Sequence, residues 1–170
     1  MHGKKWCGPE GNSTRNNPSS YYFRERERKD FKIDDIQAFQ GSCWFMSKKY
    51  YQRIGGLDGR FGTFFQEPQE IGFKVWMSGG RMVINKHTWY AHWHKNVSSG
   101  HGFSNQKKKE AFRYSTWYWM NDKWEGATRK MEDFIAFHWP IPSWPENWRE
   151  EKVQFEASNP HDYATPPVLC

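Results

Sequence analysis

The sequence contains no run of eighteen apolar residues, and its first residues, MHGKKWCGPEG, lack the apolar stretch of a secretory signal. Neither a helical membrane span nor Sec-dependent export is therefore indicated, and we expect a cytoplasmic protein. Cysteine is also scarce, because Cys7, Cys43 and Cys170 are odd in number, lie far apart and form no CxxC pair. This spacing argues against a disulfide scaffold and against a cysteine-based zinc site.

Aromatic residues, by contrast, are abundant. They make up 19% of the 170 residues, whereas all hydrophobic types together reach only 36%, so aromatic rings must supply much of the core. The formal net charge of +6 suits contact with nucleic acid, binding of a phosphorylated ligand or solubility alone, and does not decide between them. The length fits one ordinary domain.

Composition divides the chain into three parts. Residues 1–32 are rich in Gly, Pro, Ser and Asn and then alternate in charge, which is typical of a flexible arm. Residues 33–124 hold most of the strand and helix patterns, and residues 125–170 hold a short helix and a tail rich in Pro and Trp. The expected elements are a strand at 36–46, helices at 47–54 and 68–78, one or two strands at 81–95, a flexible loop at 96–106, and helices at 107–124 and 127–139.

Two carboxylates flank Pro68 where the second of these helices should begin. Pro68 suits the first position of a helix, so Glu67 should lie at the helix entrance. Glu70 and Lys74 are spaced i, i+4, and this spacing also predicts an ion pair on the helix surface. The sequence alone does not decide whether Glu70 is a functional acid or only the partner of Lys74 in this ion pair.

Two histidines form an HxH pair in the strand predicted at 81–95. In an extended chain His92 and His94 point to the same face, and such a pair can bind zinc. A zinc site also needs a third ligand, and the spacing places neither His87 nor His101 for that role.

Three segments then occur in order: QGSCWFM at 40–46, GGLDGRFGTFFQEPQEIGFKVWMSGG at 55–80 and NKHTWYAHWHK at 85–95. Together they resemble the C-terminal half of a family 2 type glycosyltransferase domain with the GT-A fold, and are similar to polypeptide N-acetylgalactosaminyltransferase catalytic domains. The resemblance implies an α/β fold in which helices flank a mixed sheet. It covers 36–95 well and extends more loosely to about residue 124.

The resemblance implies transfer of a sugar from a nucleotide-diphosphate sugar to an acceptor that the sequence does not identify. A divalent metal, Mn²⁺ or Mg²⁺, would neutralise the diphosphate, and His92 matches the family's metal-binding histidine. Lys95, and His101 within the Gly- and Ser-rich loop at 96–106, would bind the diphosphate as the loop closes.

Three further residues are candidates for binding the sugars. Gly41 and Ser42 stand where the family's strand passes close to the donor and acceptor sugars, and glycine permits a close approach of the backbone. Trp44 offers an aromatic face on which the apolar side of a sugar can stack.

The catalytic acid is less clear, because the family's usual E-D-x-E pattern is E-P-Q-E here. Pro68 therefore stands where many inverting members have an aspartate base. Either Glu67 or Glu70 replaces that base, or the transferase is of the retaining type and the acid binds the sugar.

The family places its nucleotide-binding half and its Asp-x-Asp motif before the matched region. The nearest candidate here, Asp34-Asp35, lacks the required spacing. We therefore expect a missing N-terminal half or a partner chain to complete the donor site. The alternative from another class is a non-enzymatic binding module for single-stranded nucleic acid or glycan, with stacking rings and with Lys and Arg on phosphates.

Overall fold

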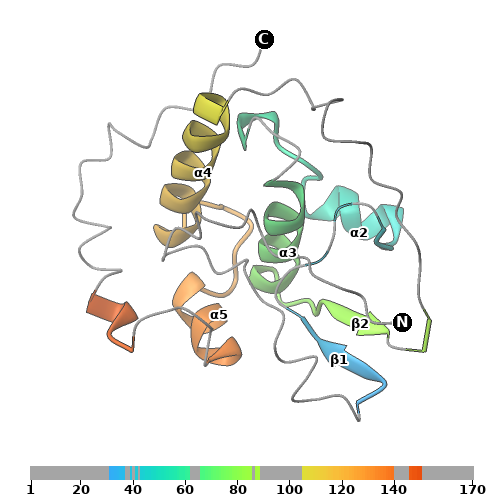
Figure 1. Ribbon diagram of the computed structural model, residues 1–170. Helices are drawn as coiled ribbons and strands as arrows, with labels where there is room; N and C mark the ends of the chain where they lie inside the picture. The colour runs from blue at the N-terminus through green and yellow to red at the C-terminus, as the bar shows by residue number, and fades with distance from the viewer. Residues whose placement is uncertain are drawn as a thin grey trace.

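A computed structural model describes most of the middle of the chain. The described residues are 31–36, 39, 41, 43–61, 66–85, 87–88, 105–139 and 146–150. Their elements, in chain order, are β1 (Ile33–Asp35), α2 (Lys48–Arg53), the 3₁₀ turn η1 (Gly59–Phe61), α3 (Glu67–Met77), β2 (Val83–Asn85), α4 (Asn105–Met120) and α5 (Met131–His138) (Figure 1).

The four predicted helices are confirmed as α2, α3, α4 and α5. Ser47 is the N-cap of α2, as its side-chain oxygen accepts the backbone N–H of Tyr50 at 3.2 Å. The strand predicted at 36–46 is wrong for the described residues, because the chain pairs earlier, at β1. Phe39 and Met46 instead pack against the apolar cluster beside α3, and the described residues of this segment form no strand.

The end of α3 follows the glycine signal in the sequence. The N–H of Gly80 donates to the carbonyl of Val75 at 2.9 Å, and the N–H of Gly79 donates to that of Trp76 at 3.0 Å. This Schellman motif needs a residue in the left-handed region, and Gly79 has a φ of 86°.

At the end of α4 an aspartate takes the left-handed position that Gly79 takes after α3. Asp122 has a φ of 50°, and its N–H donates to the carbonyl of Trp119 at 3.1 Å. The Asp122 carboxylate also accepts the N–H of Met131 at 2.7 Å, which joins the end of α4 to the start of α5. A short polar side chain tolerates this conformation because it can form such local hydrogen bonds.

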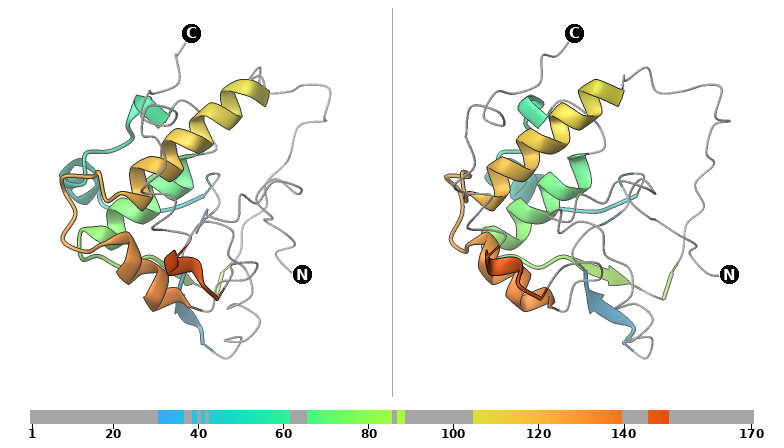
Figure 2. Two further views of the ribbon diagram at one scale, coloured as in Figure 1. Left: turned by 90° about the vertical axis from the view of Figure 1, so that its left-hand side faces the viewer. Right: turned by 60° about the vertical axis from the view of Figure 1, so that its left-hand side comes forward.

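Helix α3 is the central helix of the described part (Figures 1 and 2). One of its faces, with Phe73, Trp76 and Met77, packs against α4 and α5. Its opposite face, with Ile71 and Val75, packs against α2 and the segment before it. Because both faces are covered, nearly the whole helix is buried.

The aromatic residues fill the core between α3, α4 and α5. Phe61 stacks on Trp119, with ring centroids 5.5 Å apart and ring planes 9° apart. Phe134 of α5 meets Phe73 and Trp76 edge to face, with centroid distances of 5.2 and 5.3 Å. Offset and edge-to-face contacts of this kind are the favoured aromatic geometries, so α5 shares one core with α3 and α4.

The two strands form an antiparallel pair in which Asp35 lies opposite Val83. Arg81, which precedes β2, donates two hydrogen bonds of 2.8 and 3.0 Å to the Asp35 carboxylate. An isolated pair of strands is marginally stable, and here Met82 connects it to the apolar cluster beside α3.

The described part of the chain therefore combines helices with a small sheet, and the GT-A fold stays a prediction. Among the helices of these residues, none has the length and apolar character that crossing a bilayer requires.

Candidate functional site

Glu67 is the first residue of α3, and its carboxylate meets the segment that carries Trp44. The indole N–H of Trp44 donates to Oε1 of Glu67 at 3.1 Å. The Glu67 side chain is half-buried, and its Oε2 accepts no hydrogen bond from any of the described residues. Of the two carboxylate oxygens, Oε1 is therefore the one that the described residues hold in place.

Gly41 lies beside the other oxygen, Oε2 of Glu67. A methyl group at Gly41 would stand 3.3 Å from Oε2 of Glu67 and 3.7 Å from Cγ of Pro68. The missing side chain thus lets the backbone pass close to the carboxylate. The structure brings together three of the residues that the sequence predicts for the site, namely Gly41, Trp44 and Glu67.

Glu70 has a different environment. Its Oε1 accepts the backbone N–H of Asp58 at 2.7 Å and the Lys74 ammonium at 2.6 Å, and Lys74 also donates to the carbonyl of Gly56 at 2.8 Å. The Glu70 and Lys74 side chains are only 3% and 5% exposed. The prediction of an ion pair on the helix surface is therefore wrong in its location, because the pair is buried and holds the turn at 56–58 against α3.

Burial and pairing shift the pKa values of the two carboxylates at this turn, Glu70 and Asp58. Burial raises the pKa of Glu70, while the hydrogen bond and charge of Lys74 act in the opposite direction. The pKa of Asp58 is lowered, because the Arg60 side chain donates a hydrogen bond to its carboxylate at 2.7 Å. Both carboxylates are thus paired with a cationic side chain, whereas Glu67 accepts a hydrogen bond from the neutral indole of Trp44.

The other predicted site residues lie outside the described part of the chain. They are Ser42, His92, Lys95 and His101, together with His94 of the alternative zinc pair. Within the residues that the structure describes, no group of three or more His, Cys, Asp and Glu side chains is arranged to hold a metal ion. The Mn²⁺ or Mg²⁺ site and the zinc alternative therefore stay predictions.

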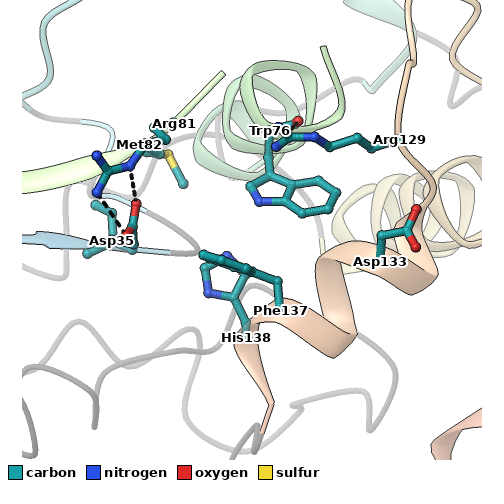
Figure 3. Close-up of a pocket in the computed structure, with 9 residues that line it drawn as sticks. Asp35, Trp76, Arg81, Met82, Arg129, Asp133, Phe137 and His138 are labelled. Atoms are coloured by element: carbon teal, nitrogen blue, oxygen red, sulfur yellow. Dashed lines mark hydrogen bonds and ion pairs between the residues drawn. The ribbon is translucent and has the colours of Figure 1, made fainter. Parts of the chain in front are cut away.

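A hollow of about 650 Å³ opens near the other end of α3 (Figure 3). The Arg81–Asp35 pair forms one side, and Arg129, whose guanidinium lies 4.9 Å from the centre of the Trp76 ring, forms another. The other described residues that line it are Ile36, Met82, Asp133, Phe137 and His138. An α-helix rises about 1.5 Å per residue, so Trp76 is roughly 14 Å from Glu67 along the α3 axis. The hollow beside Trp76 is therefore distinct from the site around Glu67. No motif predicted this hollow, because its walls come from separate parts of the chain.

The close contact at Gly41 gives a first prediction. Gly41→Ala is expected to lower the free energy of unfolding by about 1 kcal/mol, because the methyl group overpacks against the Glu67 carboxylate. Urea unfolding followed by tryptophan fluorescence measures this change. In a Glu67→Ala background the same substitution should cost less, since the opposing oxygen is gone. Equal costs in both backgrounds would contradict the contact.

Comparison with known proteins adds a relationship over part of the chain. No protein-family model matches it, and no solved structure matches it. Over 63 residues the chain is 35% identical to polypeptide N-acetylgalactosaminyltransferase 4 of Mus musculus, a stretch that covers 36% of this chain and 11% of that protein.

Two further polypeptide N-acetylgalactosaminyltransferases show similar sequence identity and coverage. Over 63 residues the chain is 32% identical to polypeptide N-acetylgalactosaminyltransferase 5 of Caenorhabditis elegans and to polypeptide N-acetylgalactosaminyltransferase 6 of Bos taurus, in each case 36% of this chain and 10% of the relative. The chain thus spans about a tenth of the length of the curated relatives that it matches. The similarity supports a glycosyltransferase relationship for about a third of the chain.

Proposed function

We propose that this chain carries the reaction-centre acid of a glycosyltransferase that moves a sugar from a nucleotide-diphosphate sugar to an acceptor. The observation that carries the proposal is the convergence of Gly41 and Trp44 on the carboxylate of Glu67. The similarity to polypeptide N-acetylgalactosaminyltransferases supports the same class of reaction.

In this proposal Oε2 of Glu67 acts beside the anomeric carbon. The acceptor oxygen forms a bond to that carbon as the bond from the carbon to the diphosphate oxygen breaks, and the nucleoside diphosphate leaves with the electron pair. In an inverting reaction Oε2 takes the proton of the acceptor hydroxyl. In a retaining reaction the proton passes to the diphosphate oxygen, and Oε2 binds a sugar hydroxyl instead. Both alternatives use the same oxygen, Oε2 of Glu67.

Glu70 is assigned a structural role instead of the catalytic one. Its Oε1 already accepts hydrogen bonds from Asp58 and Lys74, and its side chain is almost fully buried. A general base must reach the proton that it removes, and a carboxylate enclosed in this way is poorly placed to do so. Of the two acids in the E-P-Q-E motif, Glu67 is therefore our candidate.

The remaining parts of the site come from the resemblance and are proposals about residues outside the described part. His92 would hold a divalent metal, Mn²⁺ or Mg²⁺, which would neutralise charge on the diphosphate. Ser42 would contact the sugars, and Lys95 and His101 the diphosphate. We also propose that a missing N-terminal half or a partner chain supplies the nucleotide pocket.

No observation favours the nucleic-acid or glycan binding module as a second candidate. Such a module needs stacking rings on an open surface. In the described part of the chain most of the rings instead pack together in the core, among them Phe73, Trp119 and Phe134. Phe31, Phe45 and Phe137 are exposed, but they lie in separate segments of the chain.

The proposal is tested by sugar transfer. The tagged protein is purified from cells that naturally express it, so that any polypeptide completing the donor site stays attached. Release of nucleoside diphosphate from a panel of UDP- and GDP-sugars is measured with and without Mn²⁺. Glu67→Gln is expected to lower kcat by about 10²- to 10⁴-fold, the usual range for losing a general base, if the reaction is inverting. A retaining reaction gives a loss as well, because Glu67 then binds the sugar.

A matched control is available on α5. Glu132 lies in the first turn of α5, as Glu67 does in α3, and its side chain is 48% exposed. Glu132→Gln should keep the wild-type kcat. A protein that releases no diphosphate from any donor, or a Glu67→Gln variant with full activity, would overturn the proposal.

A further inference from the structure

We propose that Trp44 is a positioning residue that fixes the carboxylate of Glu67, an inference that rests on the proposed function. The sequence predicts a different role, in which the face of the Trp44 ring stacks on a sugar. In the structure the edge of the indole, through its N–H, is the part that contacts the site acid. The role of Trp44 is therefore to orient Glu67.

The hydrogen bond restricts a side chain that would otherwise be mobile. Glutamate has several side-chain torsions, and ordering such a side chain costs conformational entropy. The 3.1 Å bond from the Trp44 N–H to Oε1 fixes one of the two oxygens, and a bond to a charged acceptor is stronger than one between neutral groups. Because the carboxylate is planar, fixing Oε1 narrows the positions that Oε2 can take.

The indole is itself held by neighbouring rings. The Trp44 ring lies 5.6 Å from that of Phe39 and 6.1 Å from that of Tyr51, centroid to centroid. The Tyr51 hydroxyl in turn accepts the N–H of Leu57 at 3.2 Å. Since Tyr51 belongs to α2 and Glu67 to α3, Trp44 connects the two helices at the point where the acid is placed.

Gly41 limits Oε2 from the other side. Its backbone passes so close that an added methyl group would lie 3.3 Å from this oxygen. The Trp44 N–H and the Gly41 backbone thus define where Oε2 lies, and the reacting sugar must approach that place. A displacement of about 1 Å in a catalytic group can cost about 100-fold in rate, so an orienting residue has a measurable effect.

The kinetic test separates orientation from stacking. Trp44→Phe keeps an aromatic ring but removes the N–H, and we expect kcat to fall about 10- to 100-fold with little change in the KM of the sugar nucleotide. A second variant carries 3-(3-benzothienyl)alanine at position 44, which keeps the size and shape of tryptophan without the N–H. It should show the same loss of kcat, although its packing is conserved.

The control is the neighbouring residue Phe45, whose side chain is 95% exposed. Phe45→Ala should keep the wild-type kcat and KM. If Trp44 acts by stacking on the sugar, the benzothienyl variant should retain full activity and Trp44→Phe should mainly raise KM. That result would reject the positioning role.

A second readout does not depend on activity. The indole N–H resonance of Trp44 is assigned in the ¹⁵N-labelled chain as the tryptophan side-chain signal that disappears in Trp44→Phe. In Glu67→Ala this resonance should shift upfield and exchange faster with water, because its acceptor is lost, whereas Glu132→Gln should leave it in place. An unchanged resonance in Glu67→Ala would overturn the inference.

The two readouts distinguish the inference from the proposed function. A wild-type protein that turns over no sugar nucleotide rejects the proposed function, and the positioning role fails with it. An active wild type whose Trp44→Phe and benzothienyl variants keep the full kcat rejects the positioning role alone. A shifted resonance together with a selective loss of kcat supports both.

Discussion

Replacing Lys74 by methionine is expected to lower the free energy of unfolding by about 3–5 kcal/mol, the usual cost of removing one partner of a buried ion pair. Lys74 and Glu70 are 2.6 Å apart and almost fully buried, so the variant leaves the Glu70 carboxylate without its cation. The substitution also removes the hydrogen bond from Lys74 to the carbonyl of Gly56. Urea denaturation followed by circular dichroism measures the change.

Two comparisons show whether the unpaired charge is the cause. Glu70→Gln in the Lys74→Met background removes the buried charge but keeps an oxygen that can accept the Asp58 N–H, so it should recover a large part of the lost stability. Lys49→Met, at an exposed position of α2, should change stability by no more than about 0.5 kcal/mol. A Lys74→Met variant as stable as Lys49→Met would contradict the burial of the pair.

The loss in free energy of unfolding caused by Lys74→Met should also depend on pH. Burial raises the pKa of Glu70, and removing Lys74 takes away a group that opposes this rise. A folded state with the higher pKa binds more protons than the unfolded state, so stability increases as the pH falls through the folded-state pKa. The difference between Lys74→Met and the wild type should therefore shrink as the pH is lowered towards the ordinary pKa of glutamate.

Much of the helical structure could be predicted, because its signals are local. Ser47 as an N-cap and the glycines after α2 and α3 act within a few residues, and the structure places the helix ends there. The left-handed Asp122 was not predicted, since its stability depends on the N–H of Met131, which the sequence does not place nearby. The strand predicted at 36–46 failed for the same reason, because the packing of Phe39 and Met46 against the cluster beside α3 is a long-range contact.

The candidate site shows the same division between local and long-range information. The position of Glu67 at the start of α3 follows from Pro68 and was predicted. The bond from Trp44 to Glu67 joins residues 23 positions apart, and only the packing of α2 against α3 brings them together. The burial of Glu70 likewise depends on how the turn at 55–58 folds onto α3. Periodicity alone cannot distinguish this buried pair from one on a helix surface.

The second large effect is expected in the aromatic core, where Phe134→Ala should lower the free energy of unfolding by about 3–5 kcal/mol. Phe134 is fully buried and contacts the rings of Phe73 and Trp76 of α3, so its loss leaves a cavity between α3 and α5. Phe137→Ala is the matched control, because Phe137 lies on the same helix with 52% of its surface exposed and should cost less than about 1 kcal/mol.

This comparison also tests whether α5 belongs to the same folding unit as α3 and α4. Because the three helices share one cluster of rings, the loss at Phe134 should lower the midpoint of a single urea transition, seen equally by far- and near-ultraviolet circular dichroism. If α5 were an attached but independent element, Phe134→Ala would release it in a separate early transition and leave the main midpoint unchanged. The edge-to-face contacts of Phe134 with two rings of α3 favour the single transition, since α3 cannot keep its packing when α5 is lost.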